Sequence, residues 1–493
     1  MLETLATAEF MLAAALLLLA IVVAPYYAIQ WPGGGWVGAA ILIALGMALA
    51  WLMVRHVTQR IGATITAHLG GQWHLTLIVG AVLQVGAAAI TAPVPTSDFR
   101  MYLLLAEGLA SGVGYVDDAG RLAFMPPGMP FVLTPFVWMF GANLVAVTAV
   151  NVVLFLLGAL ALWSIAFRLF GRSVANVSVA LYTIWPTRIL SAGLPAKETL
   201  TLAMLLVGAA LSLKALSETE RRPWAAGVAA GAAYGLASLA QPGFLLFLLT
   251  IPIAFRFAAR SLGVTEFVTR IGVIMVGAML CIVPWVLRNN MIFEGEFVGV
   301  ATNGGSVFYR ANNPRATGEW AAEGEIPITH LPELEQNKLG FALGREWIKS
   351  HPLDMLRLSL RKVTYLLASD DDGPYWGIFR GTGRNHDDSR RLNSSGRIAA
   401  FELASLASLV FWILFAAWGA SALLALRSHR DPSAERLLPL IYPLLYSACV
   451  FSIFESGTRQ HIAAAGPLFA LAAFACHGSL NRVAQPARTR GLS

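Results

Sequence analysis

The feature that most constrains this chain is a series of apolar runs, each about 20 residues long. An α-helix of that length crosses a hydrocarbon core roughly 30 Å thick. The chain has 493 residues, of which 57% are hydrophobic and only 13% are charged. Because soluble domains carry roughly 25% charged residues, the sequence predicts an integral membrane protein.

The apolar runs predict an all-α polytopic membrane protein of about 12 transmembrane helices. The predicted spans are 9–29, 36–54, 74–92, 144–167, 173–190, 198–216, 223–240, 242–257, 270–288, 398–426, 436–454 and 460–478. The apolar segment 129–141 is too short to cross, so we expect it to lie in the interface or to re-enter. Only Gln241 and Pro242 separate two of the spans, as a hairpin or a kink, which leaves the count open.

Charge gives the predicted orientation. Sixteen Lys and Arg residues fall in the connections on the side of the two termini, and five fall in the short loops of the opposite side. The positive-inside rule therefore places both termini in the cytoplasm. It also accounts for the net charge of +7 without a nucleic-acid partner. The Ala-, Gly- and Arg-rich composition favours a bacterial inner membrane.

This topology divides the chain into four regions. They are two N-terminal spans in 1–73, a core in 74–288 with a first outer loop at 93–143, an extracytoplasmic loop domain with amphipathic helices in 289–397, and C-terminal spans with a cytoplasmic tail in 398–493.

Asp98 is the first candidate for chemistry. It follows Pro93 and Pro95 where the chain leaves a predicted span, and a Gly/Pro-rich loop comes after it. Thr96, Ser97 or Asp98 can cap a helix over 99–109. The alternative is a general base at the membrane interface, where partial burial tunes a carboxylate and polar substrates still reach it.

Lys197 and Glu198 stand at the start of another span, after Pro195. Pro195 and Glu198 fit an ordinary helix start. A cation at a helix N-terminus is unfavourable, so Lys197 predicts an anionic partner: Glu198, a lipid headgroup or a phosphate.

Further candidates follow the later spans. Arg288 ends a span, either snorkelling to the interface or binding phosphate. Asn303, Arg310 and Asn312 belong to an amide-rich loop that suits sugar hydroxyls or phosphates, although ordinary turns have the same composition.

The last predicted hairpin carries Glu455, Arg459 and His461 within seven residues. Either a Glu–Arg pair holds the hairpin or these groups contact a ligand. The acidic run Asp370–Asp372 is interpreted as a solvated turn. A divalent-metal site there is the less favoured alternative, so no metal cofactor is predicted.

Together these segments resemble the GT-C superfamily of membrane glycosyltransferases, in particular the bacterial branch of protein mannosyltransferases and aminoarabinose transferases. The matching segments are Asp98 with Gly112–Tyr115 and Pro126–Pro130, Pro195–Glu198, Pro284–Asn289, Asn303–Gly305 with Asn312–Gly318, His351–Pro352 with Lys362, and Glu455–Pro467. The resemblance covers roughly 74–478.

The resemblance implies an inverting transfer of a sugar from a polyprenyl-phosphate carrier to an acceptor hydroxyl on the outer face of the membrane. Asp98 would be the general base. Lys197, Arg288, Arg459 and Arg310 would bind the donor phosphate. The implied sugar and acceptor contacts are Tyr102, Glu198, Asn303, Asn312, Glu455 and His461. The implied partners are a lipid-linked sugar donor, a lipid, glycan or protein acceptor, and membrane lipids.

Two other functions stay open. A transporter or flippase of lipid-linked sugars would place charges near mid-span, whereas the charges here lie at span ends. An O-antigen-type polymerase or ligase would depend on arginines and a histidine in its large loop instead of an early aspartate. The identity of the sugar and of the acceptor is left open, because pocket shape decides it.

Overall fold

A computed structural model describes residues 2–29, 73–319, 328, 330–380, 394–428 and 434–477. Within these residues all regular structure is helical and no strand occurs. Six described helices are long and apolar enough to cross a membrane. They are α3 (Trp73–Thr91), α6 (Leu144–Phe170), α9 (Lys197–Ala215), α12 (Val264–Ile292), α17 (Ser394–Ser428) and the helical segment Glu435–Ile453, in which α18 (Leu438–Ile453) follows η6 (Ala434–Leu437). The predicted all-α membrane fold is confirmed, while the count of 12 spans and the domain boundaries stay predictions.

Several predicted spans are broken or lie elsewhere. The span 36–54 falls outside the described residues. Three other predicted spans are divided into shorter helices. The span 173–190 becomes α7 (Arg172–Thr183) and α8 (Pro186–Leu190), and the span 242–257 becomes η2 (Pro242–Phe244), η3 (Leu246–Thr250) and α11 (Ile251–Arg256). The span 460–478 becomes α19 (His461–Ala465) and α20 (Leu468–Cys476), preceded by η7 (Thr458–Gln460). A proline stands at or near each break, because it lacks the N–H that would continue a helix.

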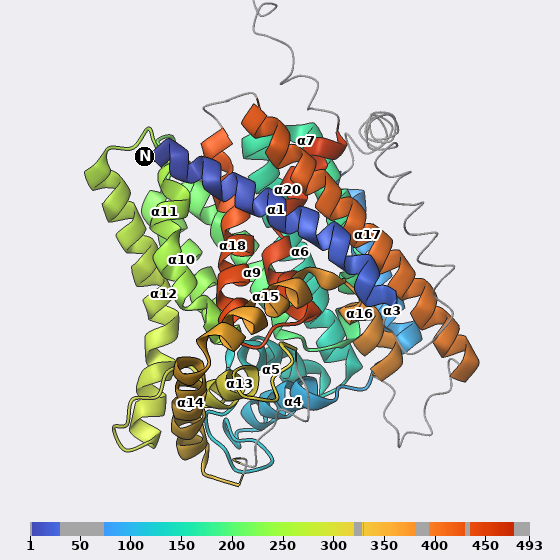
Figure 1. Ribbon diagram of the computed structural model, residues 1–493, viewed down its shortest axis with the longest axis vertical. Coiled ribbons are helices and arrows are strands. Elements are labelled where there is room, and N and C mark those ends of the chain that lie inside the picture. The colour runs from blue at the N-terminus through green and yellow to red at the C-terminus, as the bar shows by residue number, and fades with distance from the viewer. Residues whose placement is uncertain are drawn as a thin grey trace, which may run out of the picture.

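The long helices form one packed bundle. Helix α10 (Pro223–Ala240) packs between α9 and α12, and α6 packs against α7 and α9. Helix α1 (Leu2–Ile29) runs obliquely across the bundle beside α17, as Figure 1 shows. Most side chains buried between these helices are apolar. The apolar residues that make the helices suited to a membrane therefore also form the buried interior of the bundle.

Shorter helices gather at one end of the bundle, here called the site end, which is the lower end in Figure 1. They are α4 (Ser97–Ala110), α5 (Gly128–Phe140), α13 (Gly304–Ala311) and α14 (Glu333–Ser350). Helix α15 (Pro352–Ala368) and the short α16 (Asp372–Pro374) follow them along the chain. The 13-residue α5 is apolar but short, as the sequence predicts for 129–141. The helices α14 and α15 lie within 289–397, where the sequence predicts amphipathic helices.

Glycines allow α10 and α12 to approach closely. A Cβ atom on Gly231 would overlap the backbone of α12 at the Ile274 carbonyl, and one on Gly277 would overlap the backbone of α10 at Val228. Neither neighbour is the flexible end of a side chain, so a methyl group at Gly231 would force the helices apart.

We therefore expect Gly231→Ala to destabilise the protein by about 1–3 kcal/mol, the usual cost of overpacking. The measurement is thermal unfolding in detergent. The matched control is Gly272→Ala on α12, whose added methyl meets nothing within 4 Å. Equal melting temperatures for the two variants would contradict the close packing of α10 and α12.

Candidate functional site

Asp98 lies in the first turn of α4, at the site end. Thr96 is the N-cap residue, but its side chain makes no capping hydrogen bond. The carboxylate of Asp98 is 35% exposed, and its Oδ2 atom accepts a hydrogen bond of 3.2 Å from Nη2 of Arg459. No other hydrogen bond to this carboxylate is present among the described residues, so Oδ1 is available to a substrate.

Arg459 joins three separate parts of the chain. It lies in η7, its Nη2 contacts Asp98 of α4, and its Nε lies 3.1 Å from Oε1 of Glu198 in α9. The guanidinium also lies over the ring of Phe99, 5.2 Å from the ring centre. The Glu198 side chain is fully buried, so Arg459 supplies the positive charge that a buried carboxylate needs.

The charges around Asp98 keep it ionised. Burial alone would raise its pKa, but the nearby charges of Arg459, Lys197 and Arg310 outweigh burial and lower the pKa of Asp98 below its ordinary value. Burial acts to lower the pKa of Arg459, yet the carboxylates of Glu198 and Asp98 raise it overall. Both members of the pair are therefore charged at neutral pH.

Lys197 is the first residue of α9 and is partly buried. Within the described part of the chain its ammonium group makes no hydrogen bond or ion pair. Its charge nevertheless acts on Asp98. The carboxylate of Glu198, one of its predicted partners, pairs with Arg459 instead. A lysine ammonium without a partner therefore lies near the exposed carboxylate.

A second charged layer lies beside this group. Arg310 of α13 donates from Nε to Oε2 of Glu455 at 2.5 Å. The predicted pairing within the last hairpin is thus replaced by a pairing across elements. Fully buried Lys362 donates to Oδ1 of Asn312 and to the Ile453 carbonyl, each at 3.0 Å. Burial lowers the pKa of Lys362 to about 7, against the opposing charge of Glu455.

The prediction of a solvated turn at Asp370–Asp372 is wrong for Asp370. Its side chain is fully buried, and it accepts hydrogen bonds from Nε1 of Trp185 at 2.6 Å and, when that nitrogen is protonated, from Nε2 of His461 at 3.1 Å. The carboxylate is buried because α8 and the last hairpin close over it. The His461 ring also stacks on Trp412, so His461 belongs to this buried cluster.

Asp372 follows at the start of α16. Burial raises its pKa to about 8, and Glu198 adds to this effect while Arg459 opposes it. Asp372 is therefore mostly protonated at neutral pH. In the described residues no group of three or more His, Cys, Asp or Glu side chains has an arrangement that could hold a metal ion.

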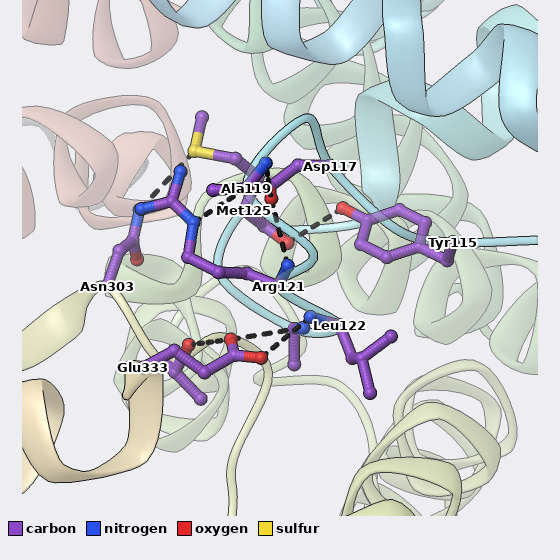
Figure 2. A network of polar contacts seen from close by, with 10 residues as sticks. Tyr115, Asp117, Ala119, Arg121, Leu122, Met125, Asn303 and Glu333 are labelled. Carbon is purple, nitrogen blue, oxygen red and sulfur yellow. Dashed lines mark hydrogen bonds and ion pairs between the residues drawn. The ribbon is translucent and has the colours of Figure 1, made fainter. Parts of the chain in front are cut away.

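The first loop is held by a network of polar contacts of its own, shown in Figure 2. The Tyr115 hydroxyl donates to the Met125 carbonyl at 2.7 Å. Glu333 of α14 accepts from the backbone N–H groups of Leu122 and Ala123, at 2.6 and 3.2 Å. The loop that follows Asp98 is thereby fixed to the helix α14.

Arg288 and Asn303 belong to this network. Arg288 donates to the Leu122 carbonyl at 2.6 Å and lies over the Trp285 ring, 4.5 Å from its centre. The Asn303 amide lies 3.8 Å from the Met125 sulfur. No contact between these two residues and Asp98 occurs among the described residues.

The structure thus brings most predicted site residues together. The group around Asp98 contains Tyr102, Lys197, Glu198, Arg310, Glu455 and Arg459, with Asn312 behind them. Sequence reasoning missed Asp372 as part of this group and did not assign a role to Lys362. The acidic run at 370–372 was the available signal for Asp372, and the amphipathic pattern around Lys362 was the available signal for that lysine.

One family model matches part of the chain. Residues 125–287 match the family model described as dolichyl-phosphate-mannose-protein mannosyltransferase. No curated protein matches the chain in sequence. The family match confirms the resemblance to GT-C membrane glycosyltransferases.

Solved structures of two glycosyltransferases are similar to the chain. The oligosaccharyltransferase AglB of Archaeoglobus fulgidus, in complex with an inhibitory peptide and a dolichol-phosphate, is 11% identical, with 82% of this chain and 50% of that chain covered and a TM-score of 0.46. ArnT of Cupriavidus metallidurans, bound to undecaprenyl phosphate, is 14% identical, with 82% and 77% covered and a TM-score of 0.38. The chain spans about half the length of AglB.

We expect Glu333→Ala to release the first loop, because the buried N–H of Ala123 and the part-buried N–H of Leu122 lose their acceptor. Hydrogen exchange of the Leu122 and Ala123 amides should accelerate about 10-fold or more, since a lost buried hydrogen bond is worth roughly 1–3 kcal/mol. The control is Glu335→Ala, an exposed glutamate in the same helical turn. Unchanged exchange at both amides would show that Glu333 does not hold the loop.

Proposed function

We propose that this chain transfers a sugar from a polyprenyl-phosphate carrier to an acceptor hydroxyl with inversion at the anomeric carbon. The observation that supports this best is the partly exposed Asp98 carboxylate. One oxygen is held by Arg459 and the other is available, and the unpaired Lys197 lies nearby. An ionised carboxylate beside an unpaired cation suits a reaction that takes up a proton and releases a phosphate.

In the proposed reaction the acceptor oxygen attacks the anomeric carbon. The bond between that carbon and the phosphate oxygen breaks, and its electron pair leaves with the polyprenyl phosphate. The proton of the acceptor hydroxyl passes to Asp98 as the attack proceeds. Each bond formed is matched by one broken, and no metal or redox partner is needed for the balance.

The leaving phosphate gains negative charge in the transition state, so fixed cations accelerate the reaction. Lys197 is the strongest candidate, because no described side chain occupies its ammonium group. Arg310 is near enough to act on Asp98 and shares its charge with Glu455. Arg288 remains a proposed donor contact, although in this structure its guanidinium binds the first loop.

The remaining candidates, Tyr102, Glu198, Asn303, Asn312, Glu455 and His461, are proposed to shape the sugar and acceptor subsites. Tyr102 fits best, because its hydroxyl is buried near Asp98 without a hydrogen-bond partner among the described residues. We further propose that the protein lies in a bacterial inner membrane with both termini in the cytoplasm. The site end would then face the extracytoplasmic side.

The location of the charges favours an enzyme over a transporter. Asp98 lies in the first turn of α4, Lys197 begins α9, and Arg459 lies between α18 and α19. These positions are helix ends, whereas a transporter places its coupling groups near mid-span.

We expect Asp98→Asn to lower transfer by about 10²–10⁴-fold, the usual contribution of a general base. The measurement is sugar release from defined polyprenyl-phosphate donors by purified protein in lipid. The matched control is Asp118→Asn, whose carboxylate is 69% exposed and lies 3.6 Å from Arg100. If both variants kept full activity, the O-antigen-type polymerase or ligase would become the better interpretation.

We expect Lys197→Gln to lower kcat/KM for the donor by about 10²-fold, because a fixed positive charge at the leaving phosphate is lost. The same donor assay measures this change. The control, Lys214→Gln, removes the same charge at the opposite end of the same helix. An equal effect of the two substitutions would remove Lys197 from the phosphate site.

A further inference from the structure

Three acidic side chains surround one arginine at the site end. Nη2 of Arg459 lies 3.2 Å from Oδ2 of Asp98, and Nε lies 3.1 Å from Oε1 of Glu198. Asp372, from a third element, lies close enough to act on the guanidinium when its carboxyl group is ionised. The ring of Phe99 lies beneath this guanidinium, and Trp376 packs edge-on against Phe99 at 5.3 Å.

This arrangement fixes both the charge and the plane of Arg459. A guanidinium is always charged and presents donors in a rigid planar fork, and here two of those donors face two different carboxylates. Glu198 is fully buried, and neither of its carboxylate oxygens makes a hydrogen bond in the described structure. Arg459 therefore supplies the counter-charge that this buried side chain requires. Asp98 shares the same cation but stays open to the surroundings.

We propose that Arg459 is a positioning residue, a cation built into the chain that holds Asp98 ionised and oriented while Glu198 competes for its charge. This inference rests on the proposed role of Asp98 as the base. It replaces the expectation that Arg459 binds the donor phosphate, because its donors on Nε and Nη2 face carboxylates of the chain itself. The remaining charged groups that act on Asp98 are Lys197 and Arg310.

The arrangement predicts opposite effects for the two partners of Asp98. Removing the Arg459 charge takes away an attraction, so the pKa of Asp98 rises and activity is lost at a higher pH as the solution is acidified. Removing the Glu198 charge takes away a repulsion and leaves Arg459 to Asp98 alone. The pKa of Asp98 then falls, and activity persists to a lower pH.

The test compares Arg459→Gln, Arg459→Lys and Glu198→Gln with the wild type in the pH dependence of kcat/KM for the donor. We expect the acidic limb to move up by about 1–3 pH units in Arg459→Gln, the usual effect of one close charge. It should move down in Glu198→Gln and change least in Arg459→Lys, which keeps the charge. The donor KM should stay unchanged, because Lys197 is retained.

A raised donor KM with an unmoved acidic limb would overturn the inference and restore Arg459 to the phosphate site. If Arg459→Gln does not fold, Glu198→Gln decides, since a downward shift shows that the charge of Glu198 acts on Asp98, as their arrangement around Arg459 requires. An upward or absent shift in that variant would refute the inference.

A second readout does not depend on the transfer reaction. Infrared titration of the purified protein reports the ionisation of carboxyl groups, and the signal missing in Asp98→Asn belongs to Asp98. The same opposite shifts should appear there. If they appear without any transfer by the wild type, the proposed function fails while the electrostatic role of Arg459 stands. If they are absent, the inference fails whatever the activity.

Discussion

The arrangement of the site end depends on one interaction, the contact of the Arg459 guanidinium with Asp98 and Glu198. A fully buried glutamate requires a counter-charge, and among the described residues Arg459 of the last hairpin supplies it. The first turn of α4, the start of α9 and the hairpin after α18 must therefore meet at one place. The ring of Phe99 packs against the guanidinium and also against Trp376, so the charged group is joined to apolar packing.

A second buried cation fixes the position of that hairpin. Lys362 reaches from α15 to the carbonyl of Ile453 and to Asn312, and Arg310 holds Glu455 in the same turn. Burial makes each of these groups costly unless it is paired or hydrogen-bonded. The hairpin is consequently held at Ile453 and at Glu455, close to Arg459 in the sequence. The position of Arg459 relative to Asp98 thus follows from contacts made by other residues.

Much of this could be predicted from local sequence, and the rest depended on long-range packing. Apolar runs of membrane length predict α3, α6, α9 and α12, because helix length is set by the bilayer and needs no tertiary information. Asp98 stands out because a Gly/Pro-rich loop follows it where a span ends, and Lys197 because a cation at a helix N-terminus is unfavourable. The partner of Glu455 could not be found in this way: Arg459 is close in sequence, but Arg310 is the residue that packing brings within 2.5 Å. Asp370 was misjudged for the same reason, since acidic runs are usually solvated and only the contact with Trp185 and His461 buries it.

The difference in exposure among the carboxylates connects this packing to chemistry. Glu198 is fully buried and committed to Arg459, and Asp372 is buried enough to hold its proton near neutral pH. Asp98 has the same cation as a neighbour but keeps about a third of its side chain open. A proton acceptor must be ionised and must also be reached by the group that gives up the proton. Among these three carboxylates only Asp98 meets both conditions, because the charge of Arg459 favours its ionised form while its side chain stays partly exposed.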